Sequence, residues 1–245
     1  MSPTPFIRCQ GIEKAFRHTV VLHGLSLEVH AGETLVLLGG SGSGKSVLLK
    51  HLNGLLRPDG GEVWVDGVAL NEVAEDALVP IRRKVGMLFQ QGALFDSLTV
   101  GENVAYPLHE HSLLAPEHMP RRVAEALEMV GLGGTEKVMP AELSGGMRKR
   151  AALARTLALE PRALLYDEPT TGLDPVVAAK INHLIRDLQR QLGLTSVVVT
   201  HDLASAFYLA DRIAFLYEGR IRFVGTPDEA RASQDAFLHE FLTAA

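Results

Sequence analysis

The chain alternates short, wholly apolar runs with longer segments in which apolar residues recur every three or four positions. Short apolar runs predict buried strands, whereas the three-to-four-residue spacing predicts amphipathic helices. We expect strands at Glu33–Leu38, Val85–Phe89, Ala163–Tyr166 and Thr195–Thr200. We expect helices at Lys45–Leu56, 121–132, 176–192 and Leu203–Leu209. Strands that alternate with helices indicate an α/β protein built on a mainly parallel sheet.

The remaining pattern adds a hairpin and a helical insertion. Ile213–Tyr217 and Ile221–Val224 flank Glu218-Gly219 and predict a β-hairpin. Residues from about 95 to 158 have helical spacing and contain no convincing strand. We therefore expect one domain over 1–245, with a core of about 1–94 and 159–245 and a helical subdomain of about 95–158 inserted into it.

Composition narrows the class of protein. Hydrophobic residues make up 47% and charged residues 22%, which is ordinary for a globular chain and excludes disorder over its bulk. The 24 Lys plus Arg against 29 Asp plus Glu argue against a nucleic-acid binder that works by overall positive charge. Cys9 is the one cysteine, so no intramolecular disulfide and no cysteine-based metal site can form. The sequence has no apolar run near the roughly 18 residues of a membrane helix and no signal-peptide pattern at its start, so membrane association would require another protein.

A glycine- and serine-rich loop follows the first predicted strand and opens the next helix. It consists of Gly39, Gly40, Ser41, Gly42, Ser43, Gly44, Lys45 and Ser46 and matches the phosphate-loop pattern. Its glycines let backbone N–H groups face phosphate oxygens, and the helix start adds a favourable dipole. Lys45 can reach the β- and γ-phosphates, and Ser46 can bind Mg²⁺. The alternative of a flexible loop is disfavoured because the strand and the helix are both in place, so a nucleoside triphosphate site is predicted.

Two carboxylates follow the strand predicted at Ala163–Tyr166. The strand would deliver Asp167 beside the phosphate loop, where it can contact Mg²⁺. Glu168, at the strand tip, could polarise the water that attacks the γ-phosphate. The alternative is a solvated acidic turn, which is disfavoured because these carboxylates would lie beside the predicted phosphate loop.

A second anion site is indicated at Ser144, Gly145 and Gly146. Ser144 can cap a helix over Met147–Leu159, and the glycines expose backbone N–H groups at its start. Alone, this pattern could be an ordinary capped helix.

We interpret the basic run Arg148-Lys149-Arg150 in that helix as a solvated face or a charge near phosphate rather than a nucleic-acid site.

The order of these motifs resembles one family. GGSGSGKS, Gln90, LSGG, LLYDEP, GLD and TH, over about residues 6–225, are together similar to the nucleotide-binding subunit of ABC transporters. The resemblance implies a P-loop NTPase core of the RecA-like type with an inserted α-helical subdomain and an N-terminal antiparallel β subdomain. It also implies ATP hydrolysis with Mg²⁺, and a homodimer that holds two ATP molecules between two chains.

The same resemblance implies roles for individual residues. Phe16 would stack on adenine, and Val47 would lie with the phosphate loop in the nucleotide site. Gln90 would touch Mg²⁺ and sense the permease, and His201 would contact the γ-phosphate. Asp174 would lie at the dimer seam, and Ser144, Gly145 and Gly146 would bind the partner's nucleotide. Each residue alone has a simpler structural interpretation, but their joint order is hard to obtain by coincidence.

Three segments resemble the Mla/Mce branch of lipid transport ATPases. They are Leu88–Phe95, Asn103–Leu108 and Met139–Met147, and Met147 replaces the more usual Gln of the signature. One departure from many family members is Gly40, where they have Pro. This branch implies lipid movement across the bacterial envelope with a separate permease and an MCE-domain protein. It also implies a place at the cytoplasmic face of the inner membrane, with the permease docked around Gln90–Leu98 through Phe95 and Leu98.

The alternatives are an importer of a small polar solute such as an amino acid, and a soluble ABC ATPase of Fe–S assembly. The sequence leaves open the lipid, the transport direction and the presence of a small regulatory subunit.

Overall fold

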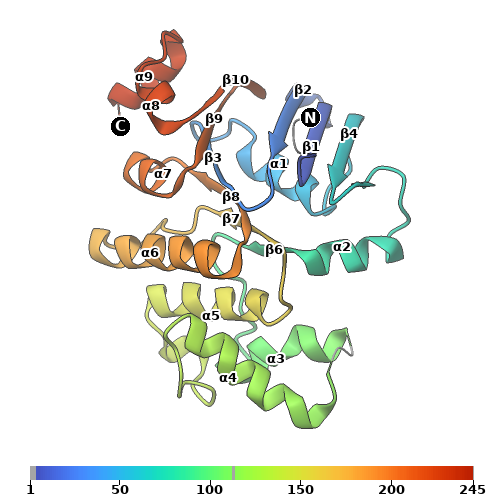
Figure 1. Cartoon of the computed structure of the whole chain (residues 1–245), viewed down its shortest axis with the longest axis vertical. Coiled ribbons are helices and arrows are strands. Elements are labelled where there is room, and N and C mark those ends of the chain that lie inside the picture. Colours follow the sequence, from blue (N-terminus) through green and yellow to red (C-terminus); the bar gives the residue numbers. More distant parts are fainter. Residues whose placement is uncertain (1–3, 112–113, 245) are drawn as a thin grey trace.

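A six-stranded sheet forms the centre of the computed structural model, which describes residues 4–111 and 114–244 (Figure 1). Its strand order is β10-β9-β3-β8-β7-β6. The parallel strands are β3 (Thr34–Leu38), β6 (Val85–Leu88), β7 (Ala163–Asp167), β8 (Thr195–Thr200) and β9 (Arg212–Tyr217), and β10 (Arg220–Gly225) runs antiparallel to β9. The predicted core strands and the hairpin are therefore confirmed, and the mixed sheet fits the expected P-loop ABC ATPase fold.

A second, antiparallel sheet lies over the first. It contains β1 (Ile7–Phe16), β2 (Thr19–Val29), β4 (Gly60–Val65) and β5 (Val68–Ala69) in the order β2-β1-β4-β5. The resemblance implied such a sheet, but hydrophobic alternation did not place its strands. The register of β1 against β2 shifts between Cys9 and Ile12 and again between Lys14 and Ala15. Such bulges break the two-residue period on which strand prediction depends.

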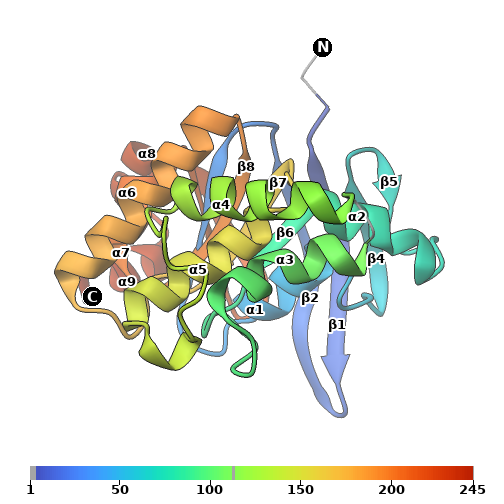
Figure 2. The same ribbon diagram turned by 90° about the horizontal axis from the view of Figure 1, so that it is seen from below.

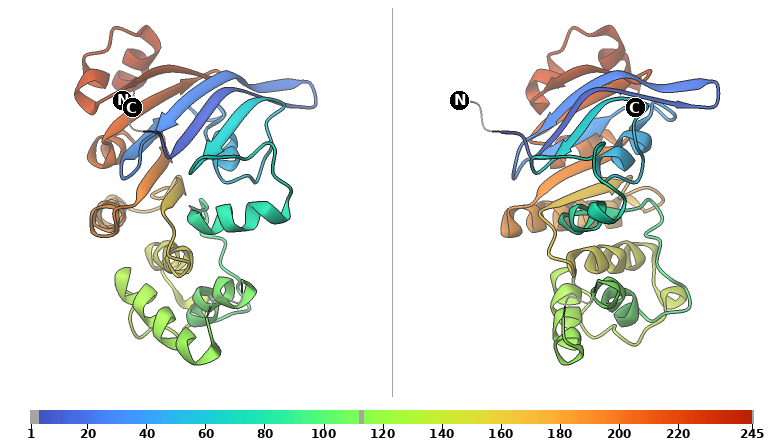
Figure 3. Two further views of the ribbon diagram at one scale, coloured as in Figure 1. Left: turned by 45° about the vertical axis from the view of Figure 1, so that its right-hand side comes forward. Right: turned by 90° about the vertical axis from the view of Figure 1, so that its right-hand side faces the viewer.

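The alternating side chains of the parallel sheet face two different layers. Leu35 and Leu37 pack with α1 (Lys45–Leu52) and the antiparallel sheet. Val36 and Leu38 pack in the other core, which contains α5 (Gly145–Leu157), α6 (Pro175–Leu192) and α7 (Leu203–Leu209). Helices α1 and α5 therefore lie on opposite faces of the same sheet, as Figure 3 also shows.

Residues 95–158 contribute helices and, within their described part, no strand. They comprise α3 (Val100–Glu110), α4 (Met119–Met129), α5 and the 3₁₀ turns η2 (Pro116–His118) and η3 (Pro140–Glu142). Figure 2 shows α3, α4 and α5 gathered on one side of the molecule. Elsewhere the chain adds η1 (Asp76–Leu78), α2 (Val79–Lys84), α8 (Pro227–Arg231) and α9 (Ala236–Ala244). Within the described residues, no helix combines the length and apolarity needed to cross a membrane.

Some predicted helix ends are wrong by a few residues. The helix expected at Lys45–Leu56 ends at Leu52, because Gly54 adopts φ 70° and left-handed backbone cannot continue an α-helix. The helix expected over 121–132 is shifted to Met119–Met129. The helix expected from Met147 starts at Gly145 and ends at Leu157.

His51 in α1 predicts how acid destabilises the fold. Burial lowers its pKa from the ordinary 6.5, against an opposing hydrogen bond to the Val47 carbonyl. Between the lowered folded value and 6.5 the unfolded chain binds more protons, so the free energy of unfolding falls as pH drops through this window. Urea unfolding at neutral and acid pH should show a smaller loss for His51→Leu than for the parent. The exposed control His18→Leu should lose as much as the parent, and equal losses in all three proteins would exclude His51 as the cause.

Candidate nucleotide-binding site

The phosphate loop, residues 39–46, joins β3 to α1 and folds around its own lysine. Lys45 Nζ donates hydrogen bonds to the Gly39 and Gly40 carbonyls, both at 2.8 Å. Gly44 adopts φ 105°, and a Cβ there would lie 3.0 Å from Leu22 Cδ2 of β2, so the position favours glycine. Burial lowers the pKa of the Lys45 ammonium, and the charges of Glu168 and Asp167 oppose that shift. A compact positive centre thus lies at the carboxyl end of β3.

The predicted magnesium ligands are adjacent. Ser46 Oγ donates a hydrogen bond of 2.8 Å to Asp167 Oδ1, although β8 separates their strands in the sheet. A hydroxyl and a carboxylate oxygen are ligands that suit Mg²⁺, which usually takes its remaining ligands from phosphates and water. The buried Ser43 hydroxyl has no hydrogen-bond partner within the described residues. These polar groups fit a Mg²⁺–nucleotide complex.

Glu168 is held from three sides at the end of β7. Its backbone has φ 50°, a left-handed conformation that is strained for a residue with a side chain. Its N–H donates to the Val199 carbonyl at 2.9 Å, and Thr171 Oγ1 donates to Glu168 Oε2 at 3.1 Å. His201 Nδ1 lies 2.9 Å from Glu168 Oε1. The carboxylate and the exposed imidazole therefore form one cluster beside the phosphate loop.

Sequence reasoning missed one residue in this cluster, Lys149. Its Nζ donates to the Gln90 carbonyl and, at 3.3 Å, to the Glu168 carbonyl. Only 7% of Lys149 is exposed, so of the two interpretations of 148–150 the solvated face is wrong for this lysine, and the charge near phosphate stays a prediction. A signal was present, because Lys149 is three and four residues before Ala152 and Leu153 and so shares their apolar face.

The signature residues begin α5. Ser144 caps the helix, with its Oγ accepting from the Met147 N–H at 3.3 Å. A Cβ on Gly146 would lie 2.5 Å from Val177 Cγ1 of α6, so only glycine fits without movement. Helices α5 and α1 lie on opposite faces of the sheet, and the cavity that Ser144 lines includes no residue of the phosphate loop.

The remaining predicted residues are Asp174 and Phe16, which are exposed, and Val47, which is partly buried. Asp174 caps α6, with its Oδ1 accepting from the Val176 and Val177 N–H groups at 3.0 Å. Phe16 ends β1, is 43% exposed, and pairs with Thr19 at the hairpin tip beyond the part of β2 that covers Gly44. Val47 lies in the first turn of α1. Phe16 and Asp174 are accessible to a ligand or a second chain, whereas the Val47 side chain packs against the core around α1.

The loop after β6 carries Gln90 and Phe95, and Phe95 forms an exposed aromatic pair with Tyr106 of α3. Arg155 of α5 donates to the Gly92 and Ala93 carbonyls at 2.9 and 2.7 Å and fixes the loop to that helix. The rings of Phe95 and Tyr106 are 4.7 Å apart, and each residue is 42% exposed. This pair is an apolar surface at the edge of the helical subdomain.

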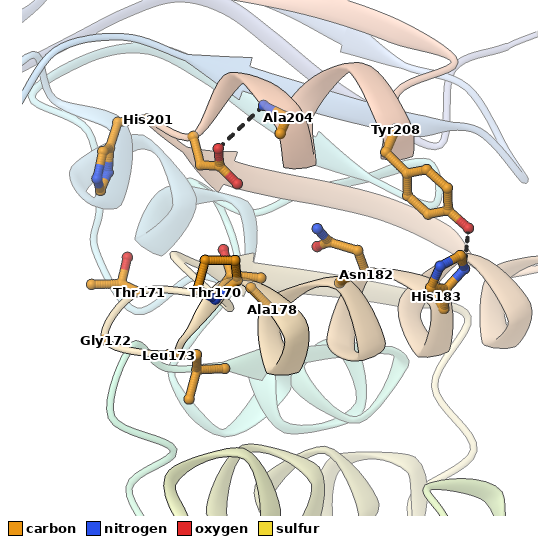
Figure 4. Close-up of a pocket in the computed structure, with 13 residues that line it drawn as sticks. Thr170, Thr171, Gly172, Leu173, Ala178, Asn182, His183, His201, Ala204 and Tyr208 are labelled. Atoms are coloured by element: carbon orange, nitrogen blue, oxygen red, sulfur yellow. Dashed lines mark hydrogen bonds between the residues drawn. The ribbon is translucent and has the colours of Figure 1, made fainter. Parts of the chain in front are cut away.

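A cavity of about 530 Å³ lies beside the cluster, between residues 170–173, α6 and α7 (Figure 4). Asn182 points into it and donates to Ser205 Oγ at 2.7 Å, and the Tyr208 hydroxyl meets His183 Nδ1 at its far end. His201 forms the near end. No phosphate-loop residue lines the cavity, so it is adjacent to the nucleotide centre rather than part of it.

Comparison with known proteins gives consistent family relations. A family model described as ABC transporter matches residues 22–171. The probable ribonucleotide transport ATP-binding protein mkl of Mycobacterium leprae is 42% identical over 96% of this chain and 68% of its own length. The chain spans 66% of the Mycobacterium tuberculosis counterpart.

Two further relatives carry different transport names. The intermembrane phospholipid transport system ATP-binding protein MlaF of Haemophilus influenzae is 41% identical over 91% of this chain and 84% of its own. The methionine import ATP-binding protein MetN of Rhizobium johnstonii is 43% identical over 88% of this chain but 59% of its own.

Solved structures agree on the fold. The ATP-binding cassette MJ0796, a dimer in a post-hydrolysis state with ADP and Pi, matches with a TM-score of 0.82 and 35% identity over 90% of this chain and 98% of its own. The cbiO1 protein of Clostridium perfringens, part of the cbiONQ ABC transporter complex, has a TM-score of 0.85 and 29% identity over 97% of this chain and 95% of its own.

The phosphate loop predicts the effect of removing its lysine. Lys45→Ala should weaken ATP binding by about a hundredfold or more, because no other side chain of the loop offsets phosphate charge. Titration with a fluorescent ATP analogue measures this loss. Lys50→Ala removes a lysine from the last turn of the same helix and should bind ATP like the parent. Equal affinity in the Lys45 variant and the parent would refute the assignment of the loop.

Proposed function

The chain belongs to the ABC transporter family and hydrolyses ATP, and from this premise we propose that it drives movement of phospholipid or another lipid through the bacterial envelope. The observation that carries the lipid proposal is that the phospholipid relative MlaF matches most of both chains. The methionine importer extends well beyond the matched region. Met147, in place of the more usual signature Gln, adds support from the resemblance to the Mla/Mce branch.

In the proposed site the phosphate loop binds the β- and γ-phosphates. Lys45 neutralises their charge. Ser46, Asp167 and the side chain of Gln90 would hold Mg²⁺, which would supply positive charge to stabilise the phosphate oxygens. Glu168 polarises the attacking water, and His201 orients its carboxylate and contacts the γ-phosphate. The exposed ring of Phe16 stacks on adenine.

Two chains complete two sites. The phosphate loop and the signature residues Ser144, Gly145 and Gly146 are anion sites on opposite faces of the sheet. A two-fold dimer makes each signature face the partner's phosphate loop, so that two nucleotides are held between two copies. Asp174 lies at the seam of this dimer. MJ0796, with the same fold, is described as a dimer bound to ADP and Pi.

Glu168→Gln tests this dimer. The variant keeps the shape of the side chain but loses the base, so it should bind ATP, hydrolyse it at least about a hundredfold more slowly, and accumulate as a dimer. Analytical sedimentation with saturating ATP and Mg²⁺ measures the mass. The same variant with Lys45→Ala should stay monomeric. A Glu168→Gln protein that is only monomeric with ATP would exclude the two-chain site.

The proposed transporter contains other polypeptides. A membrane permease docks on residues Gln90–Leu98 and the helical subdomain, where Phe95 and Tyr106 offer an exposed aromatic anchor. Leu98 is partly buried, so it contributes less exposed area to this surface than Phe95 and Tyr106 do. An MCE-domain protein conducts the lipid on the far side, and the ATPase is held at the cytoplasmic face of the inner membrane. Whether the assembly also contains a small regulatory subunit is left open by the sequence.

A gene deletion in the native bacterium separates the cargo alternatives. Loss of a lipid transporter should disturb envelope lipid distribution and raise detergent sensitivity, while uptake of methionine and ribonucleosides stays normal. Lipid extraction of separated membranes and radiolabelled uptake are the two measurements. Complementation with the wild type should restore the lipid distribution, and complementation with Lys45→Ala should not. Normal lipid distribution with failed uptake of one polar solute would replace the lipid proposal with the importer.

A further inference from the structure

Lys149 is the link between α5 and the carbonyls around Glu168. Its Nζ reaches the Gln90 carbonyl after β6 and the Glu168 carbonyl after β7. Among the hydrogen bonds of residues 4–111 and 114–244, it alone joins α5 to the segment 163–174. A lysine with 7% exposure is held there by the carbonyls and by the nearby charges of Asp167 and Glu168.

Packing around this link is incomplete. A cavity of about 300 Å³ lies between the loop after β6, α5 and the loop after Glu168, and Lys149 is part of its wall. Apolar side chains of α5 pack against Leu164 and Tyr166 of β7, so Lys149 adds a polar tie, beside the cavity, to a connection that is otherwise apolar. Arg155 fixes Gly92 and Ala93 to the same helix, so the loop after β6 moves with α5.

The position of Lys149 on α5 connects two different nucleotides. The start of this helix, Ser144 to Gly146, faces the partner's nucleotide in the dimer of the proposed function, on which this inference rests. One turn later, Lys149 contacts the backbone of Glu168, which serves the chain's own nucleotide. A shift of α5 upon binding one ATP therefore changes the support of Glu168 at the other site.

The backbone of Glu168 is suited to respond to such a shift. Its φ of 50° is a strained conformation that persists only when surrounding contacts hold it. The Glu168 N–H donates to the Val199 carbonyl, and the Glu168 carbonyl accepts from Lys149 Nζ and from the Thr171 N–H, both at 3.3 Å. Losing the Lys149 contact leaves the carbonyl held by the Thr171 N–H of its own loop alone, so the strained backbone loses its one tie to α5 and the carboxylate is aligned with His201 less firmly.

We propose that Lys149 is a positioning residue that couples the two ATP sites of the dimer, by transmitting the position of the signature helix to the backbone of Glu168. It touches neither substrate nor metal. Its effect is therefore on the rate of hydrolysis and on the cooperativity between sites, and not on the affinity of either site for ATP.

The test compares Lys149→Met, Lys149→Arg and Arg150→Met in the full chain. Arg150 is the matched control, because it is the next residue of α5 and also donates to two carbonyls, those of Val130 and Gly131, outside the site. ATPase rates against ATP concentration give kcat and the Hill coefficient, and fluorescent ATP binding gives affinity. Thermal unfolding of each variant reports on stability.

Lys149→Met should lower kcat about tenfold or more and reduce the Hill coefficient from near 2, the number of sites, towards about 1. ATP affinity should change less than about twofold, since no ligand contact is lost. Lys149→Arg keeps the charge and the donors and should restore most of the cooperativity. Arg150→Met should keep the parent's Hill coefficient even if its melting temperature falls.

Combining Lys149→Met with Glu168→Gln separates this inference from the proposed function. The double variant should dimerise with ATP as fully as Glu168→Gln alone, because both faces of the interface are intact. Failure of Glu168→Gln itself to dimerise would count against the two-chain function. A dimerising parent whose Hill coefficient is unchanged by Lys149→Met, or is lowered equally by Arg150→Met, would overturn the role of Lys149.

Discussion

The arrangement of the nucleotide site depends on the parallel sheet, because alternate side chains of each strand pack into two different cores, one on each face of the sheet. Leu35 and Leu37 bury α1 and its phosphate loop on one face, and Val36 and Leu38 bury α5 on the other. The helix starts that attract anions are thereby separated within one chain. In the proposed dimer a second chain completes each site, and the period of two along β3 is consistent with this because it assigns α1 and α5 to opposite faces.

The same constraint explains why the core of the site could be predicted from sequence while other parts could not. β3, β7 and β8 are short, fully buried strands. Asp167 ends β7, His201 directly follows β8, and Lys45 follows the glycine-rich loop after β3. The apolar runs therefore located the edge of the sheet at which the candidate nucleotide-binding residues gather. The same method did not locate β1, because the register shift between Cys9 and Ile12 interrupts the alternation of buried and exposed side chains. The signature segment needed family resemblance, since one capped helix resembles another.

Sequence reasoning did not identify Lys149 as part of the site for a different reason. Its neighbours are charged as well, with Arg148 exposed and Arg150 partly exposed, so the basic run as a whole is typical of a solvated helix face. Burial of the ammonium is tolerated because the Gln90 and Glu168 carbonyls and two carboxylate charges compensate for lost hydration. The two carbonyls belong to residues that follow β6 and β7 and lie 59 and 19 positions from Lys149 in the sequence. The helical pattern alone could suggest burial but could not supply the partners.

The most direct test of the two-chain site is a cross-link between Ser41 of one copy and Ser144 of another. The two positions would be changed to cysteine in the Glu168→Gln protein and oxidised with and without ATP and Mg²⁺. Native Cys9 should not interfere, because it is buried and burial raises the pKa of its thiol to about 12. We predict a product of twice the chain mass that forms only with ATP. A cross-link within a single chain, or equal dimer formation without ATP, would contradict the account.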